Sequence, residues 1–132
     1  MGFFDFKIME RRSDHDQLNI NLSKKKTSGH VTGFTFIDKE TKQYIIYLPS
    51  FEISAYGETE LKASTMLKAE MDSFFEHITS LSFAQLQHEM TKMGWEKGIF
   101  NKQFSKGNVD IDSALKNFSI EGEIKRITLQ AA

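Results

Sequence analysis

The sequence contains no cysteine among its 132 residues. This absence excludes disulfides, thiolate nucleophiles and cysteine-ligated metal sites, and it suits a protein of the reducing cytoplasm. No run of about eighteen apolar residues occurs, so we expect no membrane-spanning segment. The amino terminus also lacks the charged, apolar and small-residue regions of a secretory signal. We therefore predict a cytoplasmic protein with no membrane partner.

An excess of charge of one sign is also lacking. The chain has 17 basic and 18 acidic residues, for a formal net charge of −1. Such a chain creates no overall field that attracts nucleic acid, so nucleic-acid binding would require a local basic patch. Proline occurs once, whereas phenylalanine occurs twelve times and supplies apolar bulk for a folded core.

The length predicts one domain that spans residues 1–132. Its first sixteen residues, 1–16, begin with a phenylalanine-rich stretch and then become polar. Two interpretations of this stretch stay open. It is either a first strand or helical turn that packs on the domain, or an N-terminal arm that docks on another subunit.

Alternating apolar and polar residues predict strands. Pro49 lacks an amide hydrogen, so the chain must bend or follow a sheet edge there. Gly57 ends the next strand and is suited to a positive φ, and Gly122 marks a bulge or turn. The predicted strands cover residues 18–22, 31–37, 43–48, 51–56 and 118–129.

Two helices follow from the 3.6-residue period. Thr59 is the predicted N-cap of the first, and its apolar stripe comprises Leu61, Leu67, Met71, Phe74, Phe75 and Ile78. The second begins at a capping box, Ser82 to Gln85, and buries Phe83, Leu86, Met90 and Met93 before Gly94. Asp110 or Asp112 caps a third, short helix. The predicted fold is α+β: an antiparallel sheet of three to five strands packed by one long amphipathic helix, with a second helix and C-terminal strands.

Residues that carry chemistry do not form a known motif. None of the four histidines has the spacing of a zinc site, and the glycines form neither a P-loop nor a dinucleotide fingerprint. Asn108, Asp110 and Asp112 alternate like calcium ligands, but Ser113 and Ser119 replace the glycine and glutamate that such a loop needs. We predict no catalytic, cofactor-binding or metal-binding residue, and no enzyme activity.

Lysines provide the alternative hypothesis. Three consecutive lysines follow the first predicted strand, where they form either a solvated turn or a phosphate-binding loop. The candidate nucleic-acid contacts are Lys24, Lys25, Lys26, Lys97, Lys102 and Lys106.

The segment YIIYLPSFEISAYGETELKASTMLKAEMDSFF, which begins at Tyr44, resembles the HicB-like antitoxin family. The shared pattern is an apolar strand that ends in proline, a short strand, then Gly57, an acidic residue and Thr59 before an amphipathic helix. The resemblance implies a small bacterial α+β unit that blocks a partner ribonuclease. We therefore expect a non-catalytic module that binds a protein partner or itself as a dimer. The candidate partner-binding edge is Glu52, Ser54 and Tyr56. A protein with this fold and no toxin partner remains an alternative.

Overall fold

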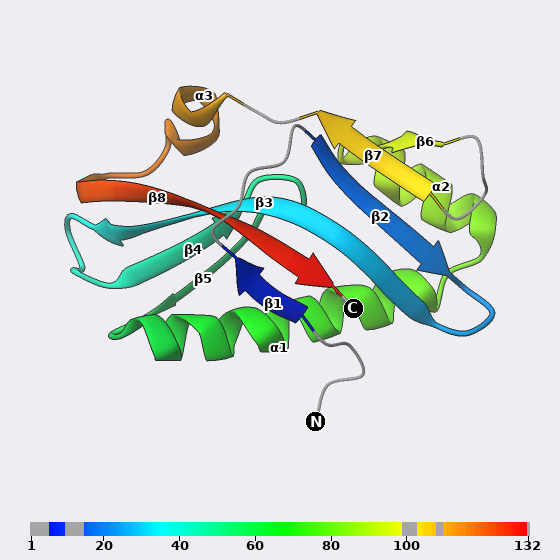
Figure 1. Cartoon of the computed structure of the whole chain (residues 1–132), viewed down its shortest axis with the longest axis horizontal. Helices are drawn as coiled ribbons and strands as arrows, with labels where there is room; N and C mark the ends of the chain where they lie inside the picture. Colours follow the sequence, from blue (N-terminus) through cyan, green and yellow to red (C-terminus); the bar gives the residue numbers. More distant parts are fainter. Residues whose placement is uncertain (1–5, 10–14, 99–102, 108–109, 132) are drawn as a thin grey trace.

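A computed structural model describes residues 6–9, 15–98, 103–107 and 110–131 of the chain. Within these ranges the fold is α+β, with an eight-stranded sheet and three helices (Figure 1). The strands are β1 (Phe6–Met9), β2 (His15–Asn21), β3 (Lys26–Asp38), β4 (Tyr44–Leu48), β5 (Ile53–Gly57), β6 (Glu96–Lys97), β7 (Gln103–Gly107) and β8 (Ile120–Ala131). The helices are α1 (Glu60–Thr79), α2 (Phe83–Lys92) and α3 (Ile111–Leu115).

The thirteen-residue strand β3 is the centre of the sheet. One of its edges pairs with β8, and the other pairs first with β2 and then with β4. The path through the sheet is β1-β8-β3-β2-β7-β6, and β5 joins through β4. All these pairings are antiparallel. The sheet is larger than predicted, because the long β3 serves three neighbours and the short strands β1 and β6 carry too few residues to show a period. Strand β7 has as many residues as β4 but only one buried side chain, Phe104, so its sequence shows no alternation.

Apolar residues pack on both faces of the sheet. The larger cluster joins α1 and α2 to β2, β4 and β5, through side chains such as Leu18, Leu48, Leu67 and Met90. A smaller cluster on the opposite face joins Phe34 and Phe36 to Leu115 of α3. Figure 1 shows α1 running along the sheet, while α3 lies at the end where β8 begins.

The predicted helix starts are confirmed. The Thr59 hydroxyl accepts a hydrogen bond of 3.2 Å from the Lys62 amide, as an N-cap does. At α2, the Gln85 amide donates to the Ser82 hydroxyl at 3.2 Å, and the Ser82 amide donates to the Gln85 side chain at 3.0 Å. Asp110 caps α3.

Two residues of the predicted apolar stripes are exposed instead. Leu61 is 76% exposed and Phe83 is 37% exposed. At 3.6 residues per turn, Leu61 lies about 120° around the helix axis from Leu67, so it falls outside the buried stripe of α1. Phe83 lies in the first turn of α2. Ala63 is fully buried against β5 in place of Leu61.

The role predicted for Gly57 is wrong in its physical basis. The glycines with positive φ in the described chain are Gly29, Gly94 and Gly122. At Gly57 the requirement is space, because a Cβ there would lie 2.6 Å from the Ala63 amide nitrogen. The bulge predicted at Gly122 is present, since the pairing of β3 with β8 changes register between Thr35 and Ile37.

The amino-terminal stretch contributes β1, which pairs with β8 from Phe6 opposite Ala131 to Met9 opposite Thr128. Residues 1–5 and 10–14 lie outside the described ranges. The predicted N-terminal docking arm over residues 1–16 falls largely on these residues and stays a prediction. Among the helices described, none has the length and apolar character needed to cross a membrane.

Candidate protein-binding edge

Strand β5 lies at an edge of the sheet. It pairs with β4, from Tyr44 opposite Gly57 to Leu48 opposite Ile53, and within the described residues it has no second strand beside it. The Tyr56 amide points away from β4 and donates to the Met66 sulfur at 3.4 Å. Because alternate amides of a strand point the same way, the Ser54 amide also faces outward. Within the described chain, the Ser54 amide on this edge is open to a partner strand, whereas the Tyr56 amide already has the Met66 sulfur as its acceptor.

The three residues predicted for this edge are exposed, and Tyr56 is 52% exposed. Ser54 lies opposite Tyr47 in the register, so their side chains share the sheet face that is turned away from α1. Burial, followed by the negative charge of Glu52, raises the pKa of the Tyr47 hydroxyl. Glu52 is exposed in the loop just before β5, near enough to Tyr47 for its charge to act on that hydroxyl.

The loop that leads into β5 is held by aromatic packing. Phe51 was predicted in the strand, but it belongs to the loop between β4 and β5, where it is buried. Its ring stacks on Trp95 at 5.5 Å between centroids, and it lies 4.6 Å from the ring of Phe74. Trp95 also donates from Nε1 to the Ser50 carbonyl at 3.0 Å. Glu52 then closes the loop at a φ of 54°.

A buried carboxylate also holds the loop between β4 and β5 in place. Asp16 is 1% exposed and accepts hydrogen bonds from the Thr32 amide at 2.8 Å, from the Thr32 hydroxyl at 3.0 Å and from the Ser50 hydroxyl. The pairing of β3 with β2 ends at His30 and its pairing with β4 begins at Phe34, so Thr32 lies in the gap between the two neighbours. The Asp16 side chain fills that gap.

Desolvation by burial raises the pKa of Asp16, and the hydrogen bonds from Ser50 and Thr32 oppose this shift. The sequence-based prediction missed this residue. Asp16 stands at the same alternation as Leu18 and Ile20, which are both buried in the larger cluster. A carboxylate on the apolar face of a strand is the signal that could have identified it.

The candidate lysines occupy different parts of the molecule. Lys24 and Lys25 lie in the turn between β2 and β3, Lys26 begins β3, and all three are exposed. Lys97 is on β6, with its Nζ 5.6 Å from the centroid of the Phe83 ring. In Figure 1, β6 lies at the upper right and the β2–β3 turn lies lower on the same side, so Lys97 is on a different part of the molecule from Lys24, Lys25 and Lys26. Lys102 lies outside the described residues.

Lys106 has a local structural partner. Its half-buried side chain donates from Nζ to the Met93 carbonyl at 2.7 Å. Met93 is the C-cap of α2, where a cation is favoured by the helix dipole and by carbonyls that lack a partner in the helix. This contact accounts for the lysine without nucleic acid.

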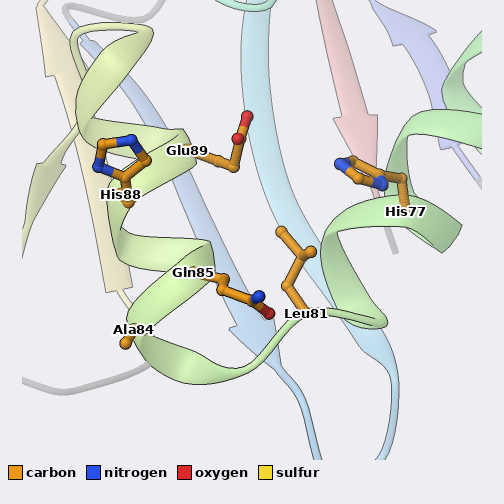
Figure 2. A pocket seen from close by; sticks show the side chains of 6 residues that line it. All are labelled: His77, Leu81, Ala84, Gln85, His88 and Glu89. Atoms are coloured by element: carbon orange, nitrogen blue, oxygen red, sulfur yellow. The ribbon is translucent and has the colours of Figure 1, made fainter.

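A hollow of about 330 Å³ lies between α1 and α2. Figure 2 shows His77 of α1 and Glu89 of α2 on opposite sides of it, with Leu81 between them. The lining is completed by Ala84, Gln85 and His88. Within the described part of the chain, no group of three or more histidine, aspartate or glutamate side chains could hold a metal ion. The hollow is open and mostly lined by exposed side chains, so it offers little that would hold a small molecule.

Comparison of the chain with protein-family models, with curated proteins and with solved structures finds no match.

Proposed function

We propose that this protein is a non-catalytic module that binds another protein through the outer edge of β5. The observation that carries the proposal is the edge itself: an outward backbone beside the exposed side chains of Glu52, Ser54 and Tyr56. Exposed edge strands bind extended segments of other proteins through main-chain hydrogen bonds. The loop before β5 is fixed by Asp16 and Trp95, which spares the protein the entropic cost of ordering the loop on binding.

The resemblance to HicB-like antitoxins supports the same proposal. The segment that carries it folds as β4, a loop that contains Pro49, β5 and then α1. Pro49 lies in the loop, Gly57 allows the close approach of α1, and Thr59 caps that helix. The antitoxin-like role, a bacterial host and a ribonuclease as the partner are parts of the proposal.

Affinity capture with matched variants tests this function. We expect the wild-type protein, used as bait in an extract of its native host, to retain one protein in near-stoichiometric amount. Replacing Tyr56 by alanine should weaken the purified complex at least about tenfold, as the loss of an interface tyrosine does. Ile111→Ala is the control, because Ile111 is 40% exposed on α3, outside the proposed edge. Calorimetry on the purified pair measures both affinities, and equal losses in the two variants would contradict the proposed edge.

Nucleic-acid binding is the alternative, and it is tested separately. With a net charge of −1 and Lys106 bound to a helix end, we expect no dissociation constant below about 100 μM for short RNA or DNA duplexes at about 0.15 M salt. Fluorescence anisotropy over a salt series measures this. Tighter binding that weakens steeply with salt, and that is lost when Lys24, Lys25 and Lys26 become alanine, would support the nucleic-acid hypothesis instead.

A further inference from the structure

In the part of the chain that the structure describes, one outward amide of β5 has a weak and movable acceptor. The Tyr56 amide donates to the Met66 thioether at 3.4 Å, and sulfur is a weak acceptor. Met66 is half-buried on α1, and methionine side chains adopt alternative rotamers at little cost. A carbonyl oxygen from an added strand would be a stronger acceptor for the same amide. The outward Ser54 amide would supply a second bond two residues away.

The side chains beside this edge define what an added strand would carry. Ser54 is small, and Glu52 and Tyr56 lie on either side of it along the chain. A residue placed opposite Ser54 would therefore have the exposed Tyr56 ring on one diagonal and, on the other side, the turn that carries the exposed Glu52 carboxylate just before the strand begins. A long cationic side chain satisfies both, through attraction to the Glu52 carboxylate and a cation–π contact with Tyr56.

A second copy of this chain does not meet that requirement with the same strand. Residues 51–60 contain three glutamates, Glu52, Glu58 and Glu60, and neither lysine nor arginine. Two β5 strands side by side would bring like charges together. The nearest cation on α1, Lys62, already pairs with Glu58 at 3.2 Å. The charge pattern favours a different protein as the occupant.

We infer that β5 accepts, as an additional strand, an extended segment of another protein that bears lysine or arginine opposite Ser54. The Met66 side chain moves aside as the segment binds. This inference rests on the proposed function and specifies the chemistry of the partner.

Selection from random twelve-residue peptides displayed on phage tests the inference without knowledge of the natural partner. We expect enriched peptides to alternate apolar and polar residues around a lysine or arginine. Their affinity should fall at least about tenfold with Ser54→Pro, which removes an outward amide but no bond to β4. With Ser54→Ala, which keeps that amide, it should stay within about twofold.

Charge reversal provides a second variant, which keeps the test decisive if proline at position 54 unfolds the protein. In the same selection, Glu52→Lys should enrich acidic peptides in place of basic ones. Enriched peptides that show no preference for a basic residue, or that bind Ser54→Pro and the wild type equally, would overturn the inference.

Nuclear magnetic resonance reports on the edge directly. Adding an enriched peptide should shift the Tyr56 amide and the Met66 methyl signals, whereas the Met71 methyl, which is fully buried, should stay in place. Shifts of the same signals with protein concentration alone would identify a second copy as the occupant and contradict the inference. If Tyr56→Ala lowers the affinity for a natural partner but Ser54→Pro and Glu52→Lys do not, the strand-addition inference is refuted. The proposed protein-binding function would then still stand. The absence of any protein partner would refute the proposed function.

Discussion

Replacing Asp16 by alanine is expected to lower the free energy of unfolding by about 3 kcal/mol, because it removes the shared acceptor of three buried donors. Those donors are the amide and hydroxyl of Thr32 and the hydroxyl of Ser50. The hydroxyls can rotate toward other acceptors, but the Thr32 amide is fixed by its strand. The loss of the Ser50 bond should also loosen the loop before β5, so peptide binding at the edge should weaken as well.

Asparagine at position 16 is the matched control. It has nearly the shape of aspartate, and its carbonyl oxygen can accept from Thr32 while its amide donates to the Ser50 hydroxyl. It also removes a buried negative charge. We therefore expect Asp16→Asn to remain within about 1 kcal/mol of the wild type at neutral pH. A loss as large as that of Asp16→Ala would show that the charge, and not hydrogen bonding, is what the site requires.

The pH dependence of the same pair has a definite sign. Burial raises the pKa of Asp16 in the folded protein above its ordinary value of 3.8. Between 3.8 and the raised pKa, the folded state holds a proton that the unfolded state has lost, so stability falls as the pH rises through this window. Asparagine does not titrate. The stability of Asp16→Asn relative to the wild type should therefore increase upward from about pH 4 and then level off.

Urea unfolding of the wild type and Asp16→Asn at a series of pH values measures this difference. Titrating groups that do not interact with Asp16 are common to both proteins and cancel in the comparison, whereas the charge of His30 acts on Asp16 and contributes to the difference. A difference that stays constant with pH would mean that the pKa of Asp16 is the same in the folded and unfolded states. A difference of the opposite sign would mean that the hydrogen bonds outweigh desolvation.

The parts of the fold that the sequence predicted are those with a local cause. The capping box from Ser82 to Gln85 and the N-cap at Thr59 depend on residues within one helical turn, and both are present. The alternation in residues 18–22 and 31–37 located β2 and β3, although both strands are longer than predicted. The exposure of Glu52, Ser54 and Tyr56 also followed from alternation.

The parts that were missed depend on partners far along the chain. Asp16, Thr32, Ser50 and Trp95 form one connected set of hydrogen bonds, but up to 45 residues separate directly bonded members. No local period brings them together. The size of the sheet was missed for the same reason, since β8 pairs with β3 from the other end of the chain. Leu61 shows a different kind of error, because it lies about 120° around the helix axis from Leu67 and so is not on the buried face, which Ala63 occupies in that turn.

Gly29 presents the other large expected effect, and it too comes from a distant partner. It lies inside β3 between Leu18 of β2 and Ala131 of β8, with a φ of 131°. A Cβ at this position would lie 2.1 Å from the Gln17 carbonyl oxygen, a distance that requires the backbone to move. Gly29→Ala therefore combines an unfavourable φ with a clash in the central strand. We expect a loss of about 4 kcal/mol in the free energy of unfolding, at the upper end for single substitutions.

Gly107→Ala is the control for this substitution. Gly107 is also a strand glycine, at the end of β7, but a Cβ there meets no heavy atom of the described chain within 4 Å. Its φ lies outside the left-handed region, so alanine should be neutral or stabilising by up to about 1 kcal/mol, through a less flexible unfolded chain. Chemical denaturation of both variants measures the contrast. If Gly29→Ala and Gly107→Ala had similar free energies of unfolding, β2 and β3 would be able to move apart at Gly29 without cost. That result would contradict the prediction.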